Sequence, residues 1–403
     1  MKRTLLLAAA IAFAALVEPA ALSAADWPQF RGPNTDCVST DTQLPVELAP
    51  ENIAWKTTLP GRGLSAPIVV AGRVILTCSS GPLQERLHVL CYNAADGTLR
   101  WHRQFWTTGR TMCHDKTSVA ASTPASDGKH IVALFSSNDM ACLDLEGNLR
   151  WFRGITRDYP NVSNSLGMAA SPVWVDQTIV AQVENDSESY CLGIDPASGR
   201  NRWKLNRPIG ANWTSPLILR ESSRNLVVLQ SKSGLDAIDA RTGKAAWSYT
   251  DGASTIPSSV SDGETLFAVS QGITALRPSA SGPPSQLWRS GQLTPATASP
   301  VVHGGRLYTL NNAGVLSCGK TVDGARLWQL RLKGPFSGTP LVAGKHLYCV
   351  GEKGHVQVVD TAAPEGKVVG ELDLGEMLLA TPAAADGALY VRSNTQLWKI
   401  ARR

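Results

Sequence analysis

One nine-residue pattern recurs along the chain at nearly constant spacing, and it restricts the possible folds more than any other feature. Its clearest copies are 195–203 (DPASGRNRW) and 239–247 (DARTGKAAW), where Gly follows Asp by four positions and Trp follows Gly by four. A polar turn closed by Gly, followed by an outgoing strand, describes a hairpin. One Trp at a fixed place on each such strand suits an indole wedged between neighbouring sheets, with its N–H bonded to a carbonyl.

Looser copies keep the same order of residues. They cover 93–101, 144–151, where the Asp comes one position late, and 320–328, where Lys320 replaces the Asp. Two further units depart more strongly, with Arg277 in the Asp position of one and Gly370 in the Trp position of the other. We expect one Trp per unit to clamp neighbouring sheets together, and the expected clamps are Trp55, Trp101, Trp151, Trp203, Trp247, Trp288 and Trp328.

A second landmark is a small residue followed by Pro at the start of a short apolar segment. It occurs at 66–67, 123–124, 171–172, 215–216, 299–300, 339–340 and 381–382, with Ser258-Ser259 in the remaining place. Successive intervals are 57, 48, 44, 43, 41, 40 and 42 residues. A period in the forties that contains only strand-like sequence is typical of propeller blades. The sixth unit, for example, predicts strands at 300–302, 306–310, 315–318 and 325–330.

The pattern predicts an all-β chain, an eight-bladed β-propeller of four-stranded antiparallel blades. The eighth unit is incomplete, because residues 382–400 supply three strands and then the chain ends. The segment 52–58 carries Trp55 where an outer-strand Trp belongs, so we expect this N-terminal strand to complete the last blade. Such closure leaves no open sheet edge at the seam.

The segments before the propeller have other assignments. Residues 1–25 combine Lys2 and Arg3, an apolar run and small residues before position 26, which predicts a secretory signal peptide and export to the periplasm or cell envelope. An uncleaved N-terminal membrane anchor is the alternative, and no later segment is expected to span a membrane. Residues 26–51 read as a Pro/Gly-rich leader, and 52–403 as a single propeller. The net charge of +5 is scattered, which argues against nucleic acid as a partner.

The eight cysteines look mainly structural. Cys91, Cys142 and Cys318 lie two residues before the Asp position of the repeat, where other units have Gly or Ala, so a small buried residue is expected there. Cys78, Cys191 and Cys349 fall on predicted strands and are expected to be buried as well. Cys37 and Cys113 lie in loop or leader sequence, and their disulfide state stays open.

Two connections break the repeat because they are long and polar. The segment 107–118 contains Arg110, Cys113, His114, Asp115 and Lys116. The segment 154–168 contains Asp158, Asn161 and Asn164. Both lead from an outer strand to the next inner strand, so both are expected on the same face of the ring. A rim of this kind could bind a protein or a small polar ligand. The alternative is that these residues only form turns.

The turns between second and third strands are expected on that face too. One of them brings Glu184, Asn185 and Asp186, which are possible ligands of a divalent ion, although no metal site is confidently indicated. Trp213 precedes an inner strand and is expected to place an indole at the axial mouth. Signatures of phosphate loops, zinc proteases and serine hydrolases are absent from the sequence, so no catalytic residue is predicted.

The combination of a small residue with Pro, the D-x-x-T-G-x-x-x-W pattern and the period resembles the PQQ-like β-propeller family over 52–400. The leader DWPQFRGPN followed by such a propeller resembles exported bacterial repeat proteins without an assigned activity. The resemblance implies two possible functions. One is a non-catalytic binding or scaffold protein, similar to the propeller subunit of outer-membrane assembly machineries, with no cofactor expected. The alternative is a quinoprotein-like oxidoreductase that uses PQQ and calcium.

Overall fold

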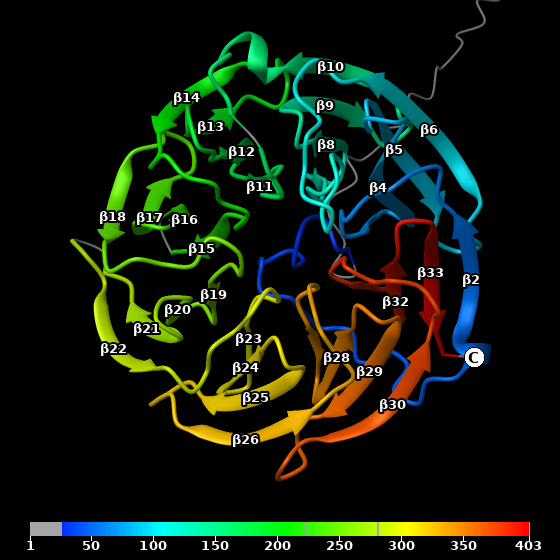
Figure 1. Ribbon diagram of the computed structural model, residues 1–403, viewed down its shortest axis with the longest axis vertical. Helices are drawn as coiled ribbons and strands as arrows, with labels where there is room; N and C mark the ends of the chain where they lie inside the picture. The colour runs from blue at the N-terminus through cyan, green and yellow to red at the C-terminus, as the bar shows by residue number, and fades with distance from the viewer. Residues whose placement is uncertain (1–25, 164, 222–223, 280–281, 403) are drawn as a thin grey trace, which may run out of the picture.

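The computed structural model describes residues 26–163, 165–221, 224–279 and 282–402, and Figure 1 shows their strands arranged as a closed ring. The predicted signal peptide, residues 1–25, lies outside the described residues. The eight sheets are antiparallel blades that follow one another around the ring, so the predicted eight-bladed propeller is confirmed. Within the described part of the chain, helical structure is limited to two short 3-10 turns, η1 (Pro50–Asn52) and η2 (Ile155–Arg157).

Each blade has four strands, which follow chain order in blades 1 to 7, with the first strand at the centre of the ring. The strands of blades 1 to 4 are β3 (Ile68–Val70), β4 (Arg73–Ser80), β5 (Arg86–Asn93), β6 (Leu99–Trp106); β7 (Ala125–Ser126), β8 (His130–Leu134), β9 (Asp139–Asp144), β10 (Leu149–Gly154); β11 (Val173–Val175), β12 (Thr178–Val183), β13 (Tyr190–Ile194), β14 (Asn201–Asn206); β15 (Leu217–Arg220), β16 (Asn225–Ser231), β17 (Gly234–Asp239) and β18 (Ala245–Tyr249).

Blades 5 to 7 repeat this order, and blade 8 closes the ring. Their strands are β19 (Val260–Ser261), β20 (Leu266–Ala268), β21 (Ile273–Arg277), β22 (Ser285–Ser290); β23 (Val301–His303), β24 (Arg306–Leu310), β25 (Val315–Lys320), β26 (Arg326–Arg331); β27 (Leu341–Ala343), β28 (His346–Val350), β29 (His355–Asp360), β30 (Lys367–Asp373); β31 (Ala383–Ala385), β32 (Ala388–Arg392) and β33 (Gln396–Ala401). The outer strand of blade 8 is β2 (Ile53–Thr58), which pairs with β33. The predicted closure by an N-terminal strand is therefore confirmed.

The register of the outer strands explains why the position two residues before the Asp of the repeat, on the third strand, holds a small residue. In blades 1 to 6, the Trp of the outer strand pairs directly with that residue on the third strand, as Trp101 does with Cys91 and Trp203 with Gly193. A Cβ atom on Gly193 would lie 2.0 Å from the Trp203 indole. An irregularity in register beside the Trp, as between Leu149 and Trp151, re-aims the indole. The position opposite Trp therefore has room only for a small side chain.

The indole of one blade lies on the turn of the next blade. Trp203, for example, lies over Gly243 of blade 4 and donates from Nε1 to the Ala240 carbonyl at 3.1 Å. Trp55, Trp101, Trp151 and Trp288 make the same pair of contacts with the blade that follows each of them. Trp247 faces blade 5, whose turn carries Arg277, and its buried Nε1 has no partner among the described residues. In blade 7, Gly370 replaces Trp and the leader passes over it at Val46.

The leader, residues 26–51, lies against the ring on the face that carries the turns between first and second strands. It crosses the centre of the ring, and its short strand β1 (Val38–Ser39) pairs in parallel with β27. Hydrogen bonds join it to every blade, through Trp27–Val69, Ser126–Pro28, Trp174–Gln29, Ile218–Thr35, Arg31–Ser259, Arg31–Pro300, Val342–Cys37 and Gly387–Asp41. The leader therefore covers the centre of this face, which we call the leader face.

All eight cysteines are unpaired thiols in this structure. Cys37 in the leader and the six cysteines on strands are buried, while Cys113 is half-buried. Burial raises the pKa of the Cys37 thiol to about 12, although Arg31 opposes the shift. These thiols pack as small apolar side chains.

Candidate functional site

The two long connections pack against each other on the opposite face, which we call the loop face. The His114 N–H donates to the Leu166 carbonyl at 3.0 Å. Cys113 lies beside Gly167, where an added Cβ would come within 2.7 Å of the Cys113 Cβ. Gln84 donates to the Cys113 Sγ at 3.3 Å from the neighbouring turn. Segments 107–118 and 154–168 therefore form one joined surface over blades 1 to 3.

Most of the predicted polar residues of these loops are exposed. Arg110, His114 and Asp115 are exposed in the first loop, as are Asp158 and Asn161 in the second. Asn164 lies outside the described residues.

Local contacts orient two of the exposed residues. The His114 Nδ1 accepts a hydrogen bond from the Lys116 N–H at 3.1 Å, which holds the tip of the first loop. Asp158 accepts from the Arg153 Nε at 2.8 Å.

Lys116 reaches across the mouth of the ring to blade 7. Its Nζ lies 2.9 Å from a carboxylate oxygen of Glu352, and the Ser337 hydroxyl donates to the other oxygen at 2.7 Å. The Lys116 side chain is 61% exposed and that of Glu352 is 9% exposed. The loop after blade 1 is therefore anchored to a blade far from it in sequence.

A cavity of about 240 Å³ lies on the axis of the ring beneath this bridge. Trp213 lines it, and the indole Nε1 donates to the Gly167 carbonyl of the second long loop at 3.0 Å. Lys116 and Thr117 line it from the first long loop, and Phe30 of the leader lines it from the opposite side. The cavity is therefore lined by residues from both faces of the ring.

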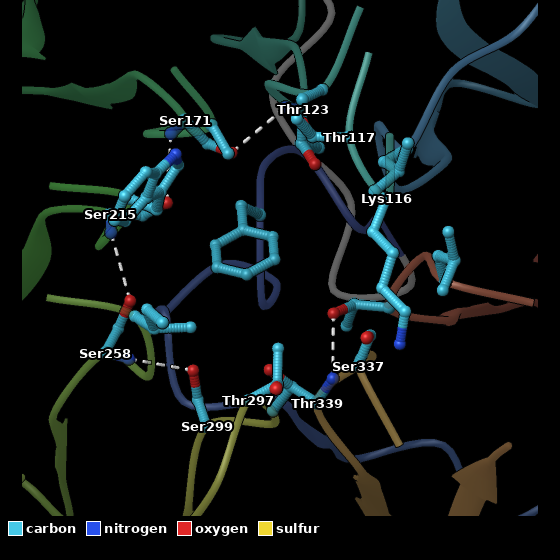
Figure 2. A pocket seen from close by; sticks show the side chains of 18 residues that line it. Lys116, Thr117, Thr123, Ser171, Ser215, Ser258, Thr297, Ser299, Ser337 and Thr339 are labelled. Carbon is cyan, nitrogen blue, oxygen red and sulfur yellow. Dashed lines mark hydrogen bonds between the residues drawn. The ribbon is translucent and has the colours of Figure 1, made fainter. Parts of the chain in front are cut away.

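The wall of this cavity is a belt of hydroxyl side chains from the small residue–Pro landmarks. Each hydroxyl accepts a hydrogen bond from the backbone N–H of the corresponding residue one blade earlier, at 2.8–3.0 Å. Figure 2 shows Ser171, Ser215, Ser258 and Ser299 following one another around the cavity. The bonds run to Thr123 from Ala66, to Ser171 from Thr123, to Ser215 from Ser171, to Ser258 from Ser215, to Ser299 from Ser258 and to Thr381 from Thr339.

The structure corrects the expected placement of Glu184 and Asn185, which are buried and not presented at the rim. Glu184 Oε1 lies 2.6 Å from the Arg207 Nε, and Asn212 donates to its other oxygen at 2.8 Å. Burial opposes the charge of Arg207, but Glu184 and Asp236 offset that effect and raise the pKa of Arg207. The carboxylate of Glu184 is therefore one half of a buried ion pair.

Asn185 and Asp186 lie in the same turn but differ in their exposure to solvent. Asn185 Oδ1 accepts from the N–H groups of Ser163 and Ser187 at 3.1 and 2.9 Å, and its Nδ2 donates to the Glu188 carbonyl. Asp186 alone is exposed. Asn185 thus ties the turn of blade 3 to the second long loop.

The residues of the axial cavity do not fit a calcium-held quinone. Calcium takes six to eight oxygen ligands, with carboxylates among them. The lining side chains supply hydroxyl oxygens and one ammonium group but no carboxylate. Across the described residues, no three His, Cys, Asp or Glu side chains cluster closely enough to hold a metal. The side-chain oxygens of Glu184 and Asn185, which could otherwise bind calcium, already accept hydrogen bonds from the protein, as described above.

The belt and Phe30 were not anticipated as parts of a site. The signal for the belt was present, because Ser or Thr occupies the position before Pro in unit after unit. That position was interpreted only as the start of a strand. Phe30 gives no comparable signal, since it stands in a leader without periodicity.

Comparison with known proteins matches most of the ring. The PQQ_2 family model, described as outer membrane protein assembly factor BamB, matches residues 38–220, 163–282 and 273–364. Outer membrane protein assembly factor BamB of Yersinia pestis is 24% identical over 201 residues, which are 49% of this chain and 46% of that protein. The same factor of Moranella endobia (strain PCIT) is 25% identical over 199 residues, with the same coverage. The match therefore spans about half the length of these curated relatives.

Solved structures share the fold at low identity. BamB from Moraxella catarrhalis has a TM-score of 0.62 and 16% identity, covering 87% of this chain and 97% of that chain. A europium-containing methanol dehydrogenase has a TM-score of 0.72 and 12% identity, covering 94% and 98%. A quinohemoprotein alcohol dehydrogenase from Comamonas testosteroni has a TM-score of 0.68 and 13% identity, covering 94% and 81%. Within the residues that the structure describes, no helix is long and apolar enough to cross a membrane.

Proposed function

The chain belongs to the PQQ_2 repeat family, whose model is described as outer membrane protein assembly factor BamB, and on that premise we propose that it is a non-catalytic binding propeller. It acts as a scaffold for a protein partner in the bacterial cell envelope, after export directed by residues 1–25. The partner docks on the loop face over segments 107–118 and 154–168. The relatives named as assembly factors support the scaffold role.

The observation that carries this proposal is the distribution of exposed apolar side chains. Large apolar residues that are at least 43% exposed occur in the loops of the loop face, at Leu83, Met112, Leu166, Ile209, Ile256 and Met377. Trp106, which is 63% exposed, ends the outer strand that leads into the first long loop. These side chains stand in several connections of one face, and we interpret them as anchors for a partner that spans this face.

A groove in the same region supplies a binding surface of suitable size. It measures about 620 Å³ and is lined by residues 82–85, Thr107 and 109–113. Arg110 and Glu85 place opposite charges beside Leu83 and Met112. A mixed surface with apolar centre and charged rim is the ordinary anatomy of a protein–protein interface.

The test is capture of envelope proteins by the purified chain before and after removal of the apolar side chains. The triple variant Met112→Ser/Leu166→Ser/Met377→Ser changes three exposed residues of the loop face. We expect recovery of the partner to fall at least tenfold, because the loss of interface anchors costs more than about 1 kcal/mol each. The polar pair His114→Ala/Asp158→Ala should weaken capture less.

The matched control is Leu99→Ser/Val322→Ser/Leu327→Ser, which changes three exposed apolar residues outside the loops of the loop face. It should capture the same partner at the same level as the unmodified chain. Equal capture by the loop-face triple variant, with an unchanged unfolding temperature, contradicts the proposed docking face. Loss of capture by the control alone would place the interface elsewhere on the ring.

A further inference from the structure

A groove of about 640 Å³ lies between blades 2 and 3, on the leader face but toward the circumference of the ring. Its walls are the turns between the first two strands of both blades, at 126–130 and 174–177, and the turn of blade 3 at 195–197. Arg150 and Arg202 line it from the outer strands β10 and β14. The leader covers the centre of this face, and none of the described residues that line the groove belongs to the leader.

The leader nevertheless fixes the two walls relative to each other. In blade 2, the Ser126 N–H donates to the Pro28 carbonyl at 2.9 Å. In blade 3, the Trp174 N–H donates to the Gln29 Oε1 at 3.0 Å. Consecutive leader residues therefore hold one wall each. A ligand in the groove meets a surface that is already ordered, which lowers the entropic cost of binding.

An aromatic surface joins the two blades inside the groove. The rings of His130 and Trp174 are nearly parallel, with an interplanar angle of 13° and centroids 6.3 Å apart. Both side chains are half-buried and line the groove. The Trp151 indole beside them donates to the Pro196 carbonyl at 2.7 Å, whereas the Trp174 indole N–H donates to no atom of the described residues. A ligand therefore meets a flat apolar surface with a free N–H at its edge.

The charged side chains of the lining balance each other. Apart from the imidazole of His130, three are basic and three are acidic: Lys129, Arg150, Arg202, Asp127, Asp176 and Asp195. Among the described residues, the side chains of Lys129 and Arg150 form no hydrogen bond and no ion pair. The groove therefore offers both hydrogen-bond donors and acceptors while its formal charges cancel.

The other charged groups are oriented by local contacts. The Arg202 guanidinium donates to the Asp195 Oδ2 at 2.7 Å and to the Thr178 Oγ1 at 3.0 Å. Asn225 donates to the Asp176 Oδ1 at 2.7 Å from blade 4. The side chains of Asp176 and Asp195 are 16% and 29% exposed, so both carboxylates are held in place yet reach solvent. Such fixed planar groups can bind a ligand in a defined orientation.

This lining restricts the chemical class of the ligand. An anion would lie beside three carboxylates, and a cation beside three basic groups, so neither sign of charge is favoured. The large exposed apolar side chains of the described chain all lie outside the groove, so it lacks the anchors of a protein interface. A sugar hydroxyl both donates and accepts hydrogen bonds, which matches a lining of guanidinium and carboxylate groups. The C–H face of a pyranose ring packs well on a flat aromatic ring.

We propose that the groove between blades 2 and 3 binds a neutral oligosaccharide built of hexopyranose units. One sugar ring lies on the Trp174 indole, and its hydroxyls form hydrogen bonds with Arg150 and Asp176. The volume of about 640 Å³ falls within the range of about 300–1,000 Å³ that is usual for small-molecule sites. This site goes beyond the proposed scaffold role, and it lies on the opposite face from the proposed docking surface, so either proposal can fail without the other.

The test is isothermal titration calorimetry at pH 7 with three neutral probes, cellotriose, maltotriose and triacetylchitotriose. Trigalacturonate and the glucosamine trimer serve as anionic and cationic comparisons, and a hexapeptide that contains Lys and Asp represents a peptide ligand. We expect at least one neutral trisaccharide to bind about tenfold more tightly than all three comparisons, because only the neutral sugars avoid like charge in the lining.

Variants of the lining locate the binding. Trp174→Ala should weaken binding of the preferred trisaccharide about tenfold, while Trp174→Phe, which keeps an aromatic ring, should retain most of it. Arg150→Ala should weaken it about fivefold through the loss of a charge-assisted hydrogen bond. The matched control is Arg100→Ala in blade 1, because Arg100 and Arg150 occupy the same position of the sequence LRW in their outer strands. It should leave binding unchanged.

Three outcomes would overturn the proposal. The first is that none of the neutral trisaccharides binds to the folded, unmodified chain. The second is tighter binding of trigalacturonate, the glucosamine trimer or the hexapeptide. The third is binding by Trp174→Ala equal to that of the unmodified chain, with an unchanged unfolding temperature. If Trp174→Ala fails to fold, the arginine pair decides, and equal binding by Arg150→Ala and Arg100→Ala contradicts the site.

Discussion

The two faces of the ring are built from the same repeat, yet they have opposite relations to the rest of the chain. On the leader face, residues 26–51 bond to every blade and bury Trp27 and Arg31 among the inner strands. On the loop face, the segments 107–118 and 154–168 leave charged and apolar side chains exposed around the axial cavity. One face is occupied by the chain itself, and the other is the face on which we propose that a partner docks.

The difference teaches that the repeat does not decide which face is functional. The repeat supplies the turns of both faces with equal regularity, because each antiparallel blade has connections at both ends. The non-repeating sequence makes the distinction, through the leader on one side and the two long loops on the other. Changes to the leader should therefore affect stability, while changes to the long loops should affect binding.

The largest expected effect comes from removing the leader together with β2. Deletion of residues 26–58 exposes the edge of β33 and removes the hydrogen bonds that join the leader to all eight blades. We expect a loss of roughly 5 kcal/mol or more in the free energy of unfolding, comparable with the whole stability of many domains. Thermal denaturation followed by circular dichroism measures it. An unchanged melting temperature would contradict both the closure of the ring and the leader's role.

A matched pair of tryptophans compares the faces directly. Trp27 on the leader face is 2% exposed and lies against Gly32, whereas Trp106 beside the first long loop is 63% exposed. We expect Trp27→Ala to cost about 3–5 kcal/mol and Trp106→Ala to change stability by about 0.5 kcal/mol. Urea denaturation of both variants gives the two values. Equal losses would mean that the exposed Trp is packed in solution.

Acid should weaken blade 1 near the loop face. His88 is buried and its Nδ1 lies 2.8 Å from the His102 Nε2, while its Nε2 lies 2.8 Å from the Ser80 hydroxyl. Burial, with smaller effects of His102 and Arg86, lowers the pKa of His88 to about 4. The unfolded chain binds this proton near pH 6.5, whereas the folded chain keeps His88 neutral until pH falls toward 4. The free energy of unfolding therefore has its full value above pH 6.5 and decreases as pH falls toward 4.

The expected loss between pH 6.5 and 4 is roughly 2–3 kcal/mol, from about 1.4 kcal/mol per pH unit of the shift. Urea denaturation across this pH range measures it. His88→Gln should flatten the profile because it removes the titrating group while keeping a polar side chain. His303→Gln, at an exposed position of blade 6, is the control and should leave the profile unchanged. A profile unaffected by His88→Gln would assign the acid sensitivity to other groups.

The smallest expected effect is that of the bridge across the mouth. Lys116→Gln removes an ion pair whose lysine side chain is 61% exposed. Exposed ion pairs contribute about 0–1 kcal/mol, so the unfolding midpoint should shift only slightly. Differential scanning calorimetry measures the shift. A loss as large as that of Trp27→Ala would show that the loop face is also required for the fold.

The repeat was sufficient to predict the fold, because each of its positions has a local physical meaning. The predicted strands of the sixth unit fall within two residues of β23, β24, β25 and β26 at their ends. The closure at Trp55 followed from a missing strand at one end and a matching Trp at the other. The small residue before the Asp position was predicted as buried, and its pairing with Trp gives the reason.

The candidate site was less predictable because its contacts join distant parts of the chain. Arg207 directly follows the outer strand β14 and neutralises Glu184, so a carboxylate in a polar turn is half of a buried ion pair. Lys116 and Glu352 are separated by 236 positions, and Arg31 and Pro300 by 269. No periodic pattern encodes such pairs. The binding roles of Arg110, His114 and Asp158 stay predictions.

The hydroxyl belt gives the ring a direction and two interruptions. Every bond of the belt passes from one blade to the hydroxyl of the next, and Ala66 of blade 1 has no hydroxyl to receive blade 8. Among the described residues, no such bond joins Ser299 to Thr339 either, so the belt forms an arc of six blades and an arc of two.

The leader contacts both arcs. Its Trp27 forms backbone hydrogen bonds with Val69 in blade 1, and its strand β1 pairs with β27 in blade 7. The leader therefore connects the two arcs of the hydroxyl belt to each other. The belt alone is divided into two segments, because other hydrogen bonds join the blades at both interruptions: Arg306 donates to the Thr361 carbonyl between blades 6 and 7, and Trp55 donates to the Ala94 carbonyl between blades 8 and 1.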